Sequence, residues 1–177
     1  MSFLTLDLNL LRVFDAVMTE QLMRRLHALA TFLAVSSGAT GSVEIAGTAP
    51  GLFAANANGQ GVAAAVALRV RGDGSQNYEA IARLENGRFV AVPIDLGPAS
   101  EQVFLVLYGT GIRAQRTINA SLGGTVSEVL FAGAVEGLAG LDQVNVRVPR
   151  TLAGRGEVEV VLTVDGRATN AVRINVR

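Results

Sequence analysis

The sequence predicts a mainly β protein: a β-sandwich preceded by an N-terminal α-helical segment. Three observations lead to this fold class. Apolar residues recur at helical spacing only before residue 40, short strand-like runs follow, and Asn-Gly or Asp-Gly pairs separate some of these runs. Because the chain has 177 residues and half of them are hydrophobic, it can bury one sizeable core. We therefore expect one main domain with an appendage.

The predicted helical segment covers residues 6–35, where Leu10, Phe14 and Val17 fall on one helix face. The stretch SSGATG follows, and its small, flexible residues interrupt the helical pattern. The predicted domains are an N-terminal helical segment over residues 1–40 and a β-sandwich domain over residues 41–177.

Turn chemistry supports the strand prediction. Asn86-Gly87 and Asp165-Gly166 lie between strand-like runs, and a type I′ hairpin turn needs positive φ at both central residues. Short strands at this spacing favour a β-sandwich. The expected strands cover residues 62–70, 78–85, 103–108, 117–122, 126–132, 143–148, 156–164 and 168–176. In YGTG, we expect the glycines that flank Thr110 to let the incoming strand turn sharply.

Four stretches, in this order, resemble one family: APGLFAANANGQGVAAAV (49–66), VLYGTGIR (106–113), LFAGAVEGLAGLDQVNVRVP (130–149) and GEVEVVLTVDGRATNAVRINV (156–176). They are similar to the Solibacter-type C-terminal domain, and the resemblance covers residues 43–177. It implies an IPT/TIG-like, immunoglobulin-like β-sandwich of unknown function. Members of that family usually lie at the ends of long secreted or surface proteins of soil bacteria.

The front of the β domain departs from this family. Only GSVEIAG precedes the PGLF motif, where members have a longer strand-rich segment. A missing strand would leave a sheet edge uncovered, and an uncovered edge invites pairing. We therefore expect a homodimer, formed through an exposed sheet edge or through the N-terminal helix.

The N-terminal stretch LDLNLLRVFDAVMTEQ (6–21) is similar to the first helix of LysR-type regulators. A DNA-binding domain of that type also needs a recognition helix, and LMRRLHALATFLAV follows here instead. The chain has 15 basic and 15 acidic residues, and zero net charge argues against a nucleic-acid surface. A packing helix is therefore favoured, and a DNA-binding regulator fragment is the third functional alternative.

The same segment also resembles a signal peptide. MRRLHALATFLAVSSGA, which starts at Met23, has two arginines, an apolar run, and small Ser37 and Ala39 at A-x-A-like spacing. If Met23 is the natural start, we expect a secreted or cell-surface protein, and otherwise a cytoplasmic one. No stretch is long enough to span a membrane.

Common catalytic and metal chemistries are poorly supported. The only histidine, His27, lies outside the β domain, and there is no Gly-x-Ser-x-Gly elbow, so a Ser-His-Asp hydrolase is not expected. One histidine without cysteine cannot supply a usual zinc site. The absence of cysteine also excludes disulfides.

The stretch DGSQNYE (73–79) contains several side chains whose oxygen atoms are of the kind that binds calcium. Asp73, Ser75, Asn77 and Glu79 alternate at spacing two, as at the start of a calcium loop. Tyr78 stands where the sixth loop position requires glycine. An ordinary polar hairpin tip is therefore favoured over a calcium site.

The alternative function is a calcium-assisted hydrolase of esters or lactones. A calcium ion would polarise the substrate carbonyl, with Asp73 or Glu79 available as a base. Glu136 and Asp142, which flank GLAGL, are a second pair of candidate catalytic carboxylates. The sequence does not give their separation, so acid and base roles are not assigned.

The first functional prediction is a non-catalytic secreted or cell-surface module for adhesion, glycan or protein binding, or assembly. Gln143 and Asn145, two residues apart in one expected strand, share a polar sheet face and are the candidate binding residues. Tyr78 and Tyr108 are far apart in the sequence, and most phenylalanines are expected in the core. We therefore expect no aromatic strip for a sugar.

Overall fold

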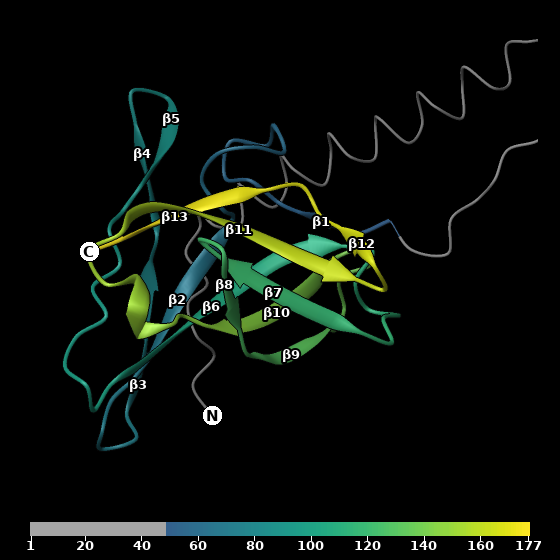
Figure 1. Ribbon diagram of the computed structural model, residues 1–177. Helices are drawn as coiled ribbons and strands as arrows, with labels where there is room; N and C mark the ends of the chain where they lie inside the picture. The colour runs from purple at the N-terminus through teal and green to yellow at the C-terminus, as the bar shows by residue number, and fades with distance from the viewer. Residues whose placement is uncertain (1–48) are drawn as a thin grey trace, which may run out of the picture. The chain divides into compact units, whose positions relative to one another are not determined.

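The computed structural model describes residues 49–177, which form antiparallel β structure (Figure 1). This part of the chain is 54% strand and 2% helical, which confirms the mainly β class. It contains no helix with the length and hydropathy of a membrane span. The predicted N-terminal helix, the regulator-like stretch, the signal-like segment and the boundary at residue 40 all lie outside the described residues.

The larger sheet has six strands, all antiparallel to their neighbours. Their order is β3 (Gln76–Ala80), β2 (Ala65–Val70), β6 (Gln102–Thr110), β10 (Asp142–Arg147) and β9 (Val129–Ala134), with β1 (Gly51–Leu52) paired to the end of β6. β1 and β2 therefore pair with different parts of the same long strand.

The second sheet has five strands and is built around β11 (Gly156–Val164). One side of β11 pairs with β7 (Ile118–Leu122), which continues to β8 (Thr125–Ser127), and the other side pairs with β12 (Arg167–Ala168) and β13 (Val172–Val176). A separate hairpin consists of β4 (Ala82–Glu85) and β5 (Arg88–Ala91). A single helical turn covers Arg150–Leu152.

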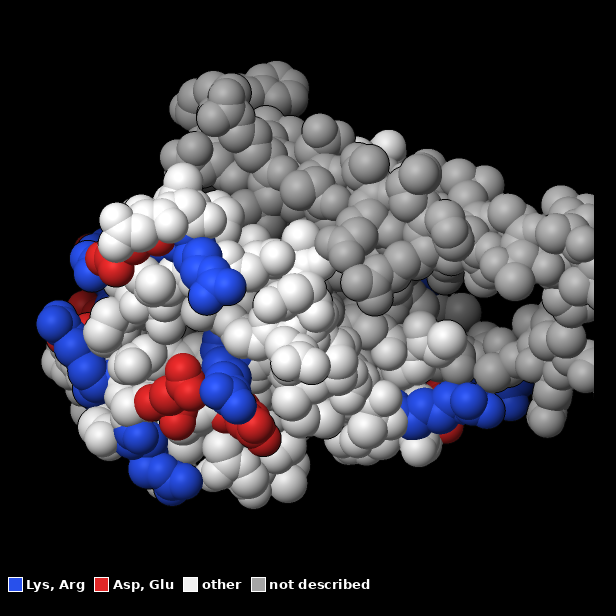
Figure 2. Space-filling view, turned by 90° about the horizontal axis from the view of Figure 1, so that it is seen from above, with Lys and Arg blue, Asp and Glu red and all other residues white. Residues whose placement is uncertain are grey.

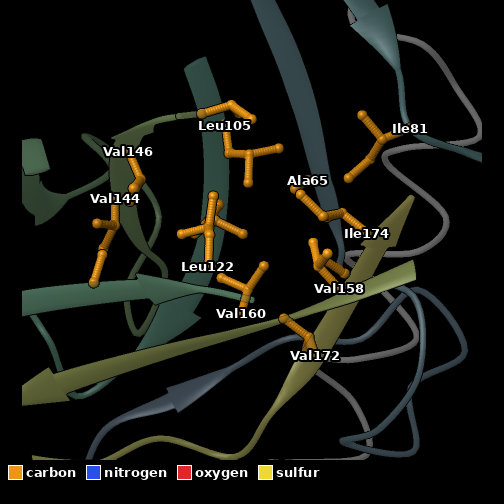
Figure 3. Close-up of a cluster of buried hydrophobic side chains, with 14 of the residues drawn as sticks. Ala65, Ile81, Leu105, Leu122, Val144, Val146, Val158, Val160, Val172 and Ile174 are labelled. Atoms are coloured by element: carbon orange, nitrogen blue, oxygen red, sulfur yellow. The ribbon is translucent and has the colours of Figure 1, made fainter. Parts of the chain in front are cut away.

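Both large sheets contribute to one buried cluster. Alternate residues of β2, β6, β7, β10, β11 and β13 point into it, as the period of two requires. Figure 3 shows Ala65, Leu105, Val144 and Val146 from the six-stranded sheet with Leu122, Val158, Val160, Val172 and Ile174 from the five-stranded sheet. Burial of these aliphatic side chains is the main stabilising contribution that the fold offers.

The two predicted type I′ turns are confirmed. Asn86 and Gly87 have φ of 48° and 78°, and Asp165 and Gly166 have φ of 48° and 79°. Each pair lies at the tip of a two-residue hairpin, the first between β4 and β5 and the second between β11 and β12. The choice of Asn-Gly and Asp-Gly follows from the positive φ at both positions.

Three expected strands are each divided in two. The run 78–85 breaks at Ile81, which is buried and accepts a hydrogen bond from the Val92 N–H outside the ladder. The run 126–132 breaks at Glu128, where the chain passes from the five-stranded sheet to the six-stranded sheet. The run 168–176 breaks at residues 169–171. A continuous apolar pattern does not show where the partner strand changes. The sequence therefore predicts a single strand at each of these three places, where the structure has two.

The prediction of a sharp turn at YGTG is wrong for its first glycine. Gly109 lies within β6, and a Cβ there would lie 2.3 Å from the Gly51 carbonyl oxygen on β1. Gly111, with φ of 73°, does follow the strand, and a Cβ there would lie 2.4 Å from the Ala49 oxygen. Both glycines therefore allow the segment that contains β1 to lie close to the end of β6.

Candidate functional site

The four candidate calcium ligands lie in the β2–β3 hairpin but do not converge. Asp73 and Ser75 are at the exposed tip, where the Asp73 Oδ1 accepts a hydrogen bond from the Ser75 N–H at 2.8 Å. Hydrogen bonds from Ser75, first from its side chain and then from its backbone, lower the pKa of the Asp73 carboxyl. Asn77 and Glu79 lie further along, on β3. The tip therefore has the local geometry of a polar turn.

The Glu79 carboxylate is engaged by a buried arginine. Arg69 Nε and Nη2 donate to the two Glu79 oxygens at 2.6 and 3.0 Å, and Arg69 Nη1 donates to Glu101 Oε2 at 2.8 Å. The hydrogen bonds from Arg69 lower the pKa of the Glu79 carboxyl. Asn77 lowers the pKa of this carboxyl further, with a smaller effect than Arg69. Within residues 49–177, no group of three or more His, Cys, Asp or Glu side chains is arranged to hold a metal ion.

The Glu136 and Asp142 carboxylates have different environments. Glu136 is exposed in the β9–β10 connection, whereas Asp142 is fully buried at the start of β10. Asp142 Oδ2 accepts from the Ile112 and Arg113 N–H groups at 2.7 and 3.1 Å, and Oδ1 accepts from Arg113 Nε at 2.5 Å. Both Asp142 oxygens therefore hold the loop that follows β6.

Gln143 and Asn145 share a sheet face, as predicted for two residues at spacing two. Gln143 Nε2 donates to Asn145 Oδ1 at 2.9 Å. Both side chains are half-buried, and the face they occupy is opposite to that of the core residues Val144 and Val146. We call this side of the six-stranded sheet the outer face.

The strand register gathers aromatic residues that are far apart in the sequence on the outer face, although Phe104 among them is buried. Cross-strand partners point to the same face, so the register places Tyr78, Leu68 and Phe104 in one row of the outer face. Tyr108 is four residues from Phe104 on β6 and lies on the same face. Sequence distance hid this arrangement, because β3 and β6 are joined only through β2.

Phe131 completes the aromatic set beside the two amides. It pairs with Asn145, while Gln143 pairs with Tyr108 on one side and Gly133 on the other. The Phe131 ring covers Gly133, because a Cβ at Gly133 would lie 3.1 Å from the ring's Cζ atom. The outer face therefore places an exposed ring, a half-buried tyrosine and two bonded amides side by side.

Exposure differs among the four aromatic residues. Tyr78 and Phe131 are 49% and 45% exposed, while Phe104 is buried beneath the Arg147 guanidinium, which lies 5.5 Å from the ring centroid. Burial raises the pKa of the Tyr108 phenol, and Tyr78 adds a smaller effect of the same sign. The two exposed rings belong to the outermost strands of the sheet order, β3 and β9.

Basic and acidic side chains lie beside one another on the face of the molecule in Figure 2, which has no broad field of one sign. Ion pairs such as Arg173 with Glu157 and Arg177 with Asp95, each at 3.0 Å, also place opposite charges next to each other. Mixed charge of this kind does not favour electrostatic attraction of a polyanion to that face.

No protein-family model, curated protein or solved structure matches the chain. The functional argument therefore depends on the geometry of the site. The residues that sequence reasoning missed are Tyr78, Tyr108 and Phe131, and the signal that would find them is the strand register rather than any local motif.

Proposed function

We propose that the protein is a non-catalytic secreted or cell-surface binding module built on an immunoglobulin-like β-sandwich. The shared cluster between the two large sheets supports the sandwich. The resemblance to the Solibacter-type C-terminal domain supports the immunoglobulin-like topology, and the signal-like stretch from Met23 supports export. Adhesion, glycan binding, protein binding and assembly are the roles that such a module serves.

One observation carries the binding role: the outer face presents exposed aromatic surface next to polar amides. The Phe131 ring lies beside Gln143 and Asn145, which are hydrogen-bonded to each other. Binding sites combine apolar and aromatic surface with a few placed polar groups. Exposed rings that are continuous with such groups are typical of an interaction surface.

The candidate carboxylates support a binding role better than hydrolysis. Glu79 is paired to Arg69, and Asp142 is buried with both oxygens occupied. A general base must reach the proton it removes, and a carboxylate already bound in this way is poorly placed to do so. Asp73 is exposed, and no other candidate ligand joins it at the hairpin tip except Ser75.

The homodimer is part of the same proposal. β3 and β9 are the outermost strands of the six-stranded order, so each is a candidate edge for a second copy. On β9, the Ala132 carbonyl already accepts a hydrogen bond from Gln115 Nε2 at 3.1 Å, so the side chain of Gln115 occupies part of that edge. Sedimentation velocity over a range of concentrations tests the dimer directly.

The test of the function measures turnover and binding in one preparation. The purified chain is assayed against chromogenic esters and lactones, with calcium and with chelator, and for retention on immobilised glycans and for self-association. We expect binding without turnover, and loss of binding in Phe131→Ala. Chelator-sensitive turnover that disappears in Asp73→Ala would establish the hydrolase instead.

A further inference from the structure

The amide pair on the outer face has unused hydrogen-bonding capacity. The bond between Gln143 Nε2 and Asn145 Oδ1 fixes one donor and one acceptor. Within residues 49–177, this is the one hydrogen bond that the structure gives for the two side chains, and it uses neither the Gln143 Oε1 atom nor the Asn145 Nδ2 group. An amide oxygen accepts and an amide NH2 donates, so the pair offers both functions side by side. A hydroxyl group, which also donates and accepts, matches this combination.

The cross-strand neighbours of the two amides carry no charge, and, within the described part of the chain, the one charged side chain close to them on this face is already paired. The cross-strand partners of Gln143 are Tyr108 and Gly133, and those of Asn145 are Val106 and Phe131. Asp142, next to Gln143 on β10, is buried on the opposite face, and Arg147, on the same face as Asn145, covers Phe104 and pairs with Glu128 at 3.0 Å. A charged ligand would lose hydration here without gaining a counter-charge, so the surface favours a neutral ligand.

The separation between the two exposed rings sets a minimum length for a ligand that contacts both. Tyr78 and Phe131 lie on β3 and β9, which are separated by four strand spacings. At the usual spacing between strands, this is about 19 Å. A single sugar ring is too short to contact both side chains, whereas a chain of several rings lying across the strands reaches both.

We infer that the outer face binds an uncharged, extended glycan, with sugar rings stacked on Phe131 and Tyr78 and hydroxyl groups bonded to Gln143 and Asn145. The inference rests on the proposed binding function and specifies its ligand. Pyranose rings combine apolar C–H faces with hydroxyl edges, so one ligand uses both the rings and the amides of this surface. A protein partner would bury the same rings, but its contacts would not depend on hydroxyl groups.

The test uses affinity electrophoresis of the full chain through native gels. The gels contain soluble neutral polysaccharides, namely a β-glucan, a xylan and a galactomannan, or the acidic polysaccharide polygalacturonate. We expect retardation by at least one neutral polymer, and no competition by its monosaccharide. Phe131→Ala and Tyr78→Ala should each raise the dissociation constant about tenfold, as expected for removal of an important contact. Phe131→Trp should retain binding.

Leu84→Ala is the matched control, because Leu84 is 62% exposed but belongs to the separate β4–β5 hairpin. Its affinity should equal that of wild type. Circular dichroism and the thermal midpoint check that each variant is folded. The inference is overturned if no neutral polymer retards the chain, if polygalacturonate alone does so, or if Phe131→Ala binds as wild type.

The two proposals fail in different ways. If no glycan binds but Phe131→Ala abolishes self-association, the glycan is excluded and the binding function stands. If the chain instead hydrolyses esters or lactones and Asp73→Ala removes that activity, the non-catalytic function fails, whatever the gels show.

Discussion

The Asn170 side chain forms hydrogen bonds with both the backbone N–H and the backbone carbonyl of Leu52. Asn170 Oδ1 accepts from the Leu52 N–H at 2.8 Å, and Nδ2 donates to the Leu52 carbonyl at 2.9 Å and to the Gly59 carbonyl at 2.7 Å. Leu52 is in β1 of the six-stranded sheet, while Asn170 lies between β12 and β13 of the other sheet. The side chain therefore links the two sheets as a strand backbone would.

Replacing Asn170 by alanine should lower the free energy of unfolding by about 2–3 kcal/mol, because Leu52 and Gly59 lose partners that are partly buried. Urea denaturation measures this loss as a lower midpoint with an unchanged m-value. Asn58→Ala is the control, since the Asn58 side chain accepts only an exposed local bond from Gln60. Equal midpoints for the two variants would contradict the linking role.

The Arg69–Glu79 pair predicts a specific dependence of stability on pH. The hydrogen bonds from Arg69 lower the pKa of the Glu79 carboxyl below its usual 4.5. A carboxyl whose pKa is lower in the folded state adds stability above its unfolded pKa, and this stability is lost as the pH falls through the folded value. Wild type should therefore lose unfolding free energy below a pH of about 4.5, the unfolded pKa of Glu79.

Glu79→Gln should be less stable than wild type at pH 7 and should have a flatter profile at acidic pH. The control is Glu85→Gln, because Glu85 pairs with Arg83 at 2.6 Å on an exposed hairpin, where such pairs contribute little. Thermal midpoints measured from pH 7 to pH 3 compare the three proteins. Parallel profiles for wild type and Glu79→Gln would show that Arg69 does not act through this carboxylate.

The sequence was sufficient for features that depend on local chemistry. The turns at Asn86-Gly87 and Asp165-Gly166 were predicted because positive φ limits which residues fit. The strand over residues 156–164 was predicted with the bounds that the structure gives to β11. The shared face of Gln143 and Asn145 followed from the period of two alone.

Features that depend on strand partners were not predictable. Thr169 shows why the run 168–176 is divided: its N–H donates to the Leu162 carbonyl at 2.8 Å and its Oγ1 accepts from the Leu162 N–H at 3.1 Å. The side chain thus replaces a backbone group of the ladder. The aromatic outer face was missed for the same reason, because the position of Tyr78 relative to Phe104 depends on a register set by three strands.

Gly109→Ala should be strongly destabilising, since a Cβ would lie 2.3 Å from the Gly51 carbonyl oxygen and β1 would have to move away from β6. Overpacking of this kind costs about 1–3 kcal/mol. Gly72→Ala is a suitable control, because its Cβ would make only an ordinary contact with Ser100, at 3.5 Å. Calorimetry should give a clearly lower midpoint for Gly109→Ala alone. Similar midpoints would mean that β1 is not held against β6.

The role of Asp142 separates the structural and catalytic interpretations of the carboxylate pair. Its oxygens accept two backbone N–H groups and the Arg113 side chain, and Asp142 itself is fully buried. The Arg113 side chain is partly exposed, but the Ile112 N–H is buried and has Asp142 as its acceptor. Because a buried hydrogen-bonding group left without a partner costs about 1–3 kcal/mol, Asp142→Ala should lower the unfolding free energy by about this amount. Glu136→Ala, at an exposed position, should stay within about 0.5 kcal/mol of wild type. If both variants remained as stable as wild type but lost an ester- or lactone-cleaving activity, the two carboxylates would be catalytic rather than structural.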